Sequence, residues 1–325
     1  MIKRVIGCLI LTAILTVGAY AANQGSAAAS ASSGASSLKP FLGRWDLYLK
    51  SPTGERPSWI EVSAPEGRLK VLFVGLTDHA TDLKKVDFKD GELQFTSPKD
   101  ESGFSEDTLF KGKLVGGQLV GTTSTPSGPY WPWTGRRAPS LMRNAAPKWG
   151  KPITLFDGKD FKGWRFSDPH GTGNWKVENG TLVNYGHGAD IITTSKFNDF
   201  KLHLEFECGP KSNSGVYLRG RYEVQIETDS AAEPPSHHTG GVYGFLDPTP
   251  EQRRQANVWQ TFDITFVGRT VTVVQNGKTM IDHQEIPGIT GGALDSHEGL
   301  PGPIYLQGSE EGRVAFRNIV ITLAE

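Results

Sequence analysis

Strict alternation of apolar and polar residues over short segments most constrains what this chain can fold into. Between residues 201 and 208 every even position is apolar and every odd position is polar, and residues 261–266 repeat the pattern. Neighbouring side chains of a strand point to opposite faces, so each such segment predicts a strand with one face in a core. The 39 glycines and 20 prolines among 325 residues supply frequent turns. The sequence therefore predicts an all-β protein.

The first 37 residues read as export and tethering segments. Lys3 and Arg4 precede a short apolar run, and the small-residue pattern Ala19-Tyr20-Ala21 follows it. This order is typical of a secretory signal peptide over residues 1–21, and the run is short for a transmembrane helix. Residues 22–37 are rich in alanine, serine and glycine and predict a flexible tether. We expect a periplasmic or extracellular protein.

The remaining chain divides into two predicted β domains. Short strand patterns at regular spacing over residues 38–138 indicate a small β-barrel or sandwich. Residues 139–152 contain three prolines and predict a linker. Residues 153–325 carry about ten further strand patterns, which favour a two-sheet jelly roll. In the first domain, His79 is expected in a solvated loop. The aromatic cluster of residues 130–133 suits stacking on sugar rings, although packing within the fold is the favoured explanation.

Charge and cysteine content exclude several functions. The chain has 34 basic and 35 acidic residues, which is not the basic excess of a nucleic-acid-binding protein. Of its two cysteines, one lies in the signal peptide, so only Cys208 would remain after export. A single cysteine allows neither an internal disulfide nor a cysteine-ligated zinc site. No ligand spacing identifies a metal site, and the oligomeric state stays open.

One predicted face is unusually rich in groups that bind sugars. Over residues 216–227 the even positions are mostly apolar, while the odd positions combine arginines, carboxylates, an amide and a phenol. These are Tyr217, Arg219, Arg221, Glu223, Gln225 and Glu227. Arginine and carboxylate groups form paired hydrogen bonds that suit carbonyls and vicinal diols. A solvated outer face is the simpler alternative, and the residues alone leave both open.

An ordered set of motifs in the second domain resembles the 3-keto-disaccharide hydrolase family. They are LFDGKDFKGW at 155–164, NSGVYLR at 213–219, YEVQI at 222–226, TGGVY at 239–243, GPIYLQ at 302–307 and FRNI at 316–319. The sequence departs from the family after Gln307, where Gly308–Gly312 replaces the frequent Asp-His-Gly. The resemblance implies a concanavalin A-like jelly roll with a sugar site on its concave sheet.

The resemblance also implies a reaction, in which a base removes the C2 proton of a 3-keto-glycoside and the C1 aglycone leaves. Water addition would make the net reaction hydrolysis. Glu223 is the expected base or acid, Arg219 the oxyanion stabiliser and His238, or its neighbour His237, the second proton-transfer group. The expected substrate-binding residues are Gln225, Arg221, Glu205, Tyr243, Gln307 and Asn213. A divalent cation is a possible electrophile.

Two other functions remain open from sequence. A non-catalytic carbohydrate-binding module would share the fold, since fold does not fix function. A structural interaction protein would use the aromatic cluster of residues 130–133 as its contact patch. An oligosaccharide or glycoside is the expected ligand in the enzyme and in the binding module.

Overall fold

The computed structural model describes residues 38–99, 103–227, 232–250, 255–309 and 311–325. The predicted signal peptide and tether lie outside these ranges. The described residues are almost entirely strands and connecting loops, with three one-turn 3-10 helices: η1 (Lys39–Phe41), η2 (Pro65–Gly67) and η3 (Pro235–His237). Among them, no helix has the length and apolarity that crossing a bilayer requires. All strands lie within one compact unit, Gly43–Glu325.

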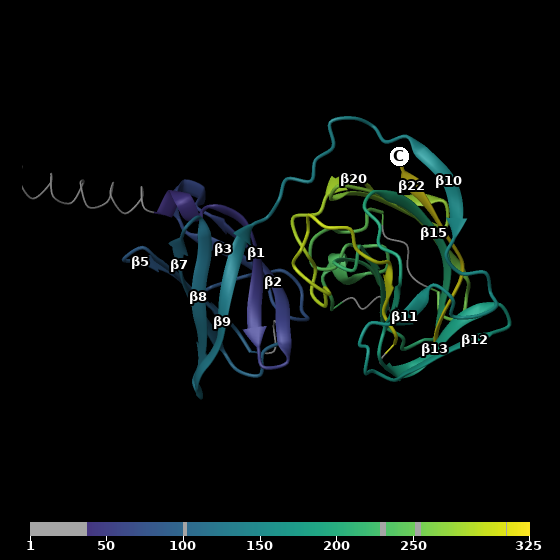
Figure 1. Cartoon of the computed structure of the whole chain (residues 1–325), viewed down its shortest axis with the longest axis horizontal. Coiled ribbons are helices and arrows are strands. Elements are labelled where there is room, and N and C mark those ends of the chain that lie inside the picture. Colours follow the sequence, from purple (N-terminus) through teal and green to yellow (C-terminus); the bar gives the residue numbers. More distant parts are fainter. Residues whose placement is uncertain (1–37, 100–102, 228–231, 251–254, 310) are drawn as a thin grey trace, which may run out of the picture. The chain divides into compact units, whose positions relative to one another are not determined.

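The first sheet is an antiparallel meander of nine strands, drawn in purple to teal in Figure 1. The strands are β1 (Gly43–Ser51), β2 (Gly54–Ser63), β3 (Lys70–Val74), β4 (Thr81–Asp82), β5 (Val86–Lys89), β6 (Glu92–Ser97), β7 (Thr108–Val115), β8 (Gln118–Thr125) and β9 (Gly128–Arg137). Their order is β4-β3-β2-β1-β9-β8-β7-β6-β5. The sheet curls so strongly that residues near its two ends meet. Phe73 of β3 packs against Phe95 of β6 and Phe110 of β7, with ring centroids 5.5 and 5.2 Å apart. This confirms a barrel-like β region.

Two further antiparallel sheets form a sandwich from the rest of the chain. The larger has the order β12-β13-β22-β15-β18-β19-β20 with β10 also paired to β22, and the smaller has the order β11-β14-β21-β16-β17. The strands of the larger sheet are β10 (Trp149–Thr154), β12 (Gly173–Glu178), β13 (Thr181–Gly188), β15 (Phe200–Cys208), β18 (Gln260–Val267), β19 (Thr270–Gln275), β20 (Lys278–Glu285) and β22 (Val314–Ala324). Those of the smaller are β11 (Trp164–Phe166), β14 (Ile191–Thr193), β16 (Ser214–Leu218), β17 (Tyr222–Ile226) and β21 (Tyr305–Leu306).

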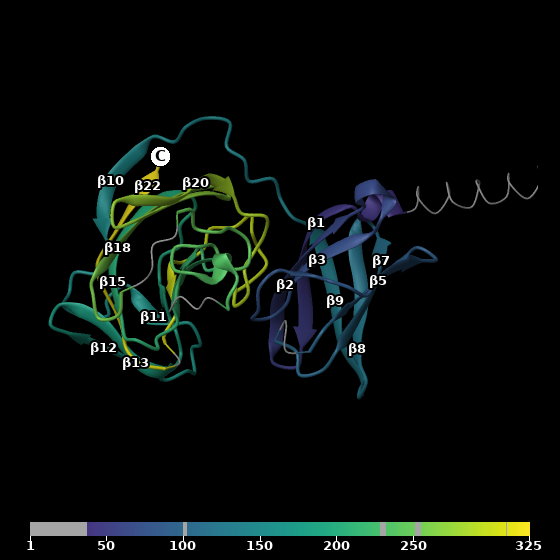
Figure 2. The same ribbon diagram turned by 180° about the vertical axis from the view of Figure 1, so that it is seen from behind.

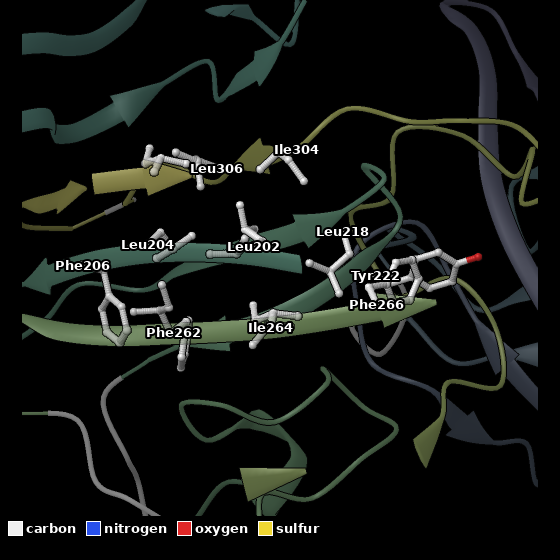
Figure 3. Packing of buried hydrophobic residues seen from close by; sticks show 14 of the residues in the cluster. Leu202, Leu204, Phe206, Leu218, Tyr222, Phe262, Ile264, Phe266, Ile304 and Leu306 are labelled. Atoms are coloured by element: carbon white, nitrogen blue, oxygen red, sulfur yellow. The ribbon is translucent and has the colours of Figure 1, made fainter. Parts of the chain in front are cut away.

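The predicted alternation produces the sandwich core. The even positions of β15 and β18 face the even positions of β16, β17 and β21, and all of them are fully buried. Figure 3 shows this packing for Leu202, Leu204, Phe206, Phe262, Ile264, Phe266, Leu218, Ile304 and Leu306. Each such side chain gains roughly 1.5–3 kcal/mol when it leaves water. The all-β sandwich expected from sequence is therefore confirmed.

The strand β10 begins inside the segment that the sequence suggests as a linker. It pairs antiparallel with the C-terminal strand β22, joining Ile153 to Ile321 and Thr154 to Val320. Figure 2 shows β10 beside the C-terminal end of β22. The last residues of the suggested linker, from Trp149 onward, are thus already part of the sandwich.

Candidate active site

The polar segment of residues 216–227 is a hairpin rather than one continuous strand. β16 and β17 are joined by a tight turn over residues 219–221, and their register pairs Tyr217 with Glu223 and Gly215 with Gln225. Both members of each pair have odd numbers, so the odd residues of the two strands still share one face. The parity expected from sequence therefore holds within the strands and fails in the turn.

Two rows of cross-strand neighbours cross this face of the smaller sheet. The first joins Tyr305, Tyr217 and Glu223, with the two tyrosine rings stacked at 4.3 Å and 13°. The second joins Gln307, Gly215 and Gln225, since the backbone amide of Gln307 donates to the Gly215 carbonyl at 3.0 Å. The rows place a carboxyl group, two phenols and two side-chain amides on one surface that turns away from the core.

The carboxyl group of Glu223 occupies space that is open only because residue 215 is glycine. A Cβ atom at 215 would overlap Oε1 of Glu223, so any side chain there would displace the carboxyl group. The backbone of Glu223 is fixed as well, because its amide donates to Oγ1 of Thr290 at 3.1 Å. Glu223 is only 3 % exposed, which makes it a buried and positioned acid.

Burial raises the pKa of Glu223 to about 8. The hydroxyl group of Tyr217 partly opposes this shift by hydrogen bonding, and the nearby charges of Glu227 and Asp190 add to it. Burial also raises the pKa of Tyr217, Tyr243 and Tyr305 well above the usual value, so these phenols keep their protons at neutral pH. A group whose pKa lies near the working pH suits proton transfer.

Asp190 is a second carboxyl group that the sequence did not single out. It precedes β14 and accepts hydrogen bonds from the Tyr305 hydroxyl at 2.7 Å and the Gly308 amide at 2.8 Å. Gly308 opens the segment where the family's frequent Asp-His-Gly is replaced, so the replacement loop here holds a carboxylate in the site. Asp190 was missed because a lone aspartate before a short apolar segment has no distinctive pattern.

A loop of the first sheet completes the wall of the site. Thr77 and Asp78 line it, and the loop packs so closely that a Cβ at Gly291 would overlap the Asp78 carbonyl. Asp78 accepts from the hydroxyl of Tyr243 at 3.4 Å and contacts Nδ1 of His79 at 2.7 Å. His79 does lie in a loop, as expected, but the loop is only partly solvated, because it packs against residues 241–244 and 290–293.

These groups enclose a polar cavity of about 450 Å³. That volume lies in the range of small-ligand sites. Its walls are Thr77, Asp78, Asp190, Asn213, Tyr217, Glu223, Gln225, Tyr243, Gly292, Tyr305, Gln307 and Gly308. Among the described residues, none donates to the buried Oε1 of Gln307. Buried acceptors are nearly always satisfied, so this atom is suited to a ligand hydroxyl. Five of the nine site residues expected from sequence thus meet here: Glu223, Gln225, Tyr243, Gln307 and Asn213.

The structure does not bring Arg219 or Arg221 into the cavity. Arg219 lies in the hairpin turn with φ of 52°, and its Nη2 donates to the Gly268 carbonyl at 2.7 Å. Arg221 pairs through Nε with Asp295 at 2.6 Å. The turn rotates both side chains away from the face that parity predicted. The structure therefore does not support the expected roles of Arg219 in oxyanion stabilisation and of Arg221 in substrate binding, because neither residue lines the cavity.

Glu205 and His238 also lie outside the cavity walls. Glu205 is on the outer face of β15, where it accepts from Nε of Arg317 at 2.7 Å. His238 follows η3, and it is its neighbour His237 whose ring packs on Tyr243 at 4.5 Å. Burial lowers the pKa of His237, which favours its neutral form. Among the described residues, no three or more histidine, cysteine, aspartate or glutamate side chains lie close enough together to hold a metal ion.

The fold and site together define a β-sandwich protein with a buried acid in a polar, sugar-sized cavity. A family model described as a 3-keto-alpha-glucoside-1,2-lyase-like domain matches residues 151–322, more than half of the chain. The chain therefore belongs to this family, as the sequence resemblance implied. Apart from the first two residues of β10 and the last two of β22, every strand of the two sandwich sheets lies within the matched residues.

Individual relatives resemble part of the chain. A Bacteroides thetaiotaomicron protein named 3-keto-disaccharide hydrolase is 33 % identical over 167 residues, covering 40 % of this chain and 58 % of the relative. The chain thus spans little more than half the length of this relative. Among solved structures, a glycosyl hydrolase candidate from Parabacteroides distasonis is 30 % identical, covers 56 % of this chain and 94 % of its own, and has a TM-score of 0.46. A second one from that organism is 22 % identical, with coverages of 54 and 94 % and a TM-score of 0.43.

Proposed function

We propose that this protein is an exported enzyme that cleaves 3-keto-glycosides by proton abstraction at C2 and elimination of the C1 substituent. The observation that carries the proposal is the Glu223 carboxyl group, positioned against Gly215, buried, and with its pKa raised to about 8. Family membership supplies the substrate class. The predicted signal peptide supports export.

In the first step, the carboxylate of Glu223 takes the C2 proton. A ketone at C3 acidifies this proton, because the electron pair of the broken C–H bond is delocalised onto the ketone oxygen. As that pair then forms the C1–C2 double bond, the C1–O bond breaks and the leaving alkoxide takes a proton from the protonated Glu223 or from water. The products are an enone sugar and a free alcohol. A positioned general base contributes roughly 10²- to 10⁴-fold to such a step.

The developing negative charge on the ketone oxygen requires hydrogen-bond donors. Tyr217, Tyr243 and Tyr305 stay protonated because burial raises the pKa of each. Their hydroxyl groups now donate to the Gly291 carbonyl, Asp78 and Asp190, so one of them would turn from that acceptor to the ketone oxygen when substrate binds. They take the place that sequence reasoning gave to Arg219. Gln225, Gln307 and Asn213 provide amides for the sugar hydroxyls.

Addition of water to the enone would turn the elimination into net hydrolysis. The name of the Bacteroides relative, 3-keto-disaccharide hydrolase, supports this outcome for the present chain. Lyase and hydrolase share the first proton transfer, so Glu223 serves both. A carbohydrate-binding module would have no need for a buried carboxyl group with a raised pKa, which favours the enzyme.

The test is to incubate the mature protein with a 3-keto-glucoside and its unoxidised parent glucoside, and to follow both by NMR. We expect an enone sugar or 3-keto-glucose from the first and no reaction of the second, because only the ketone acidifies C2. Cleavage of both substrates at similar rates would contradict this mechanism. Saturable binding without turnover would instead support the binding module. A parallel reaction with a chelator determines whether a divalent cation takes part.

A further inference from the structure

A second cavity of about 510 Å³ adjoins the site, and Thr77 and Gly292 line both. We propose that it binds the leaving half of the substrate, so that a glycoside whose C1 substituent reaches this cavity is cleaved more efficiently than one with a small substituent. This inference rests on the proposed function, because it places the 3-keto sugar beside Glu223. With the 3-keto sugar in the first cavity, the group that occupies the second cavity is the substituent that departs from C1.

The aromatic wall of this second cavity is Trp131, from the cluster whose role the sequence left open. Its ring stacks on Tyr130 at 4.2 Å and 18°, and its backbone amide donates to Oγ1 of Thr123 at 2.7 Å. The hydrogen bond holds the backbone at Trp131, and the stacking on Tyr130 restrains the indole that lines the cavity. Trp133 from the same cluster is instead buried in the barrel, beside Phe110 at 6.0 Å. One tryptophan thus packs and the other is available to a ligand.

Polar groups that line the second cavity suit the hydroxyls of a sugar. Thr53, Glu55 and Arg56, at the turn between β1 and β2 and the start of β2, line the cavity together with Trp131. Nη2 of Arg56 donates to Oγ1 of Thr53 at 3.1 Å, which orders the guanidinium group. An aromatic ring together with polar donors and acceptors in one cavity suits the apolar ring face and the polar rim of a pyranose.

Gly292 lies where the two cavities adjoin. Its φ is 75°, and its amide donates to the Leu76 carbonyl at 3.1 Å, which holds the loop containing Thr77. A Cβ at 292 would lie 2.6 Å from the Tyr217 hydroxyl oxygen. A side chain there would therefore intrude between the two cavities.

The test compares kcat/KM for a 3-keto-disaccharide and for methyl 3-keto-glucoside, whose leaving group is too small to reach Trp131. For Trp131→Ala we expect a loss of about tenfold on the disaccharide, as a change of roughly 1.4 kcal/mol would give, and less than twofold on the methyl glycoside. Trp259→Ala is the matched control, because this partly exposed tryptophan packs on Arg317 and lines neither cavity. It should affect both substrates equally.

Equal effects of Trp131→Ala on the two substrates, or none, would overturn the inference. Should Trp131→Ala fail to fold, Arg56→Ala provides the same comparison from an exposed position, with about a threefold selective loss expected for one weakened hydrogen bond. If the wild-type protein cleaves neither substrate, the proposed function itself fails. Calorimetric binding of the unoxidised disaccharide against methyl glucoside then tests the second cavity: loss of a disaccharide preference on Trp131→Ala supports it, and no preference in the wild type excludes it.

Discussion

The strands β15 and β17 share the same alternating sequence pattern, but the polar face of β15 is partly exposed to solvent and that of β17 is buried. On the outer face of β15, Glu205 and Glu207 are partly exposed and paired with Arg317 and Arg313. On the outer face of β17, Glu223 is buried under loops from other parts of the chain. Alternation specifies which residues share a face, but whatever covers that face determines their chemistry.

The pKa values express this difference directly. Burial alone would raise the pKa of Glu205, but hydrogen bonds from Asn318 and Arg317 outweigh it, and the net pKa is lowered. For Glu223, burial dominates and the pKa rises to about 8. One glutamate is a charged surface partner, and the other can exchange a proton near neutral pH.

The largest expected effect is on catalysis. Glu223→Gln preserves shape and removes the base, so we expect kcat to fall by about 10²- to 10⁴-fold. Glu207→Gln, on the other glutamate-bearing strand, should stay within about twofold, as surface substitutions usually do. Steady-state kinetics on a 3-keto-glucoside measures both. Full activity in Glu223→Gln would remove Glu223 from the mechanism.

A smaller loss is expected from displacing the same carboxyl group without removing it. In Gly215→Ala the new methyl group would occupy the place of Oε1 of Glu223. A misplaced catalytic group costs on the order of 100-fold in kcat. Thermal melting must show that the variant is folded; a folded Gly215→Ala with wild-type kcat would mean that this contact does not position the base.

Next comes the pH dependence. In the free enzyme kcat/KM should rise about tenfold per pH unit and level off above about pH 8, where Glu223 is ionised. Folded Glu223 holds its proton to higher pH than the unfolded chain does. Its contribution to stability is thus fully present below the ordinary carboxyl pKa and is lost as pH rises through about 8. The Tm of the wild type should therefore fall relative to Glu223→Gln between pH 5 and 9, and a constant difference would contradict the raised pKa.

The smallest effect is expected on the exposed face of β15. Glu205→Gln weakens a partly exposed pair with Arg317, and such pairs contribute about 1 kcal/mol or less to stability. Denaturant unfolding of this variant at low and high salt measures the change. A fall of several kcal/mol in the free energy of unfolding would contradict the partial exposure of this pair, because it would mean that the outer face of β15 is buried.

Much of the fold could be predicted because its rules are local. A period of two in residues 201–208 and 261–266 places Leu204 and Phe262 in the core wherever those strands pair. The same parity brought Glu223, Gln225 and Gln307 onto one face, since the register of β16 with β17 and β21 pairs odd residues with odd. The prediction failed at Arg219, where the turn between the strands breaks the period.

The sequence by itself determined the strands, their buried faces and the family motifs, because side-chain alternation and turn chemistry act between close neighbours in the chain. Only the tertiary structure decided what lies over each polar face. Asp78 reaches the site from more than 100 residues before Glu223, and Asp190 reaches it through hydrogen bonds from Tyr305 and Gly308. Burial, and the raised pKa that follows from it, is a property of atoms brought together by folding, so no local pattern around Glu223 could have given it.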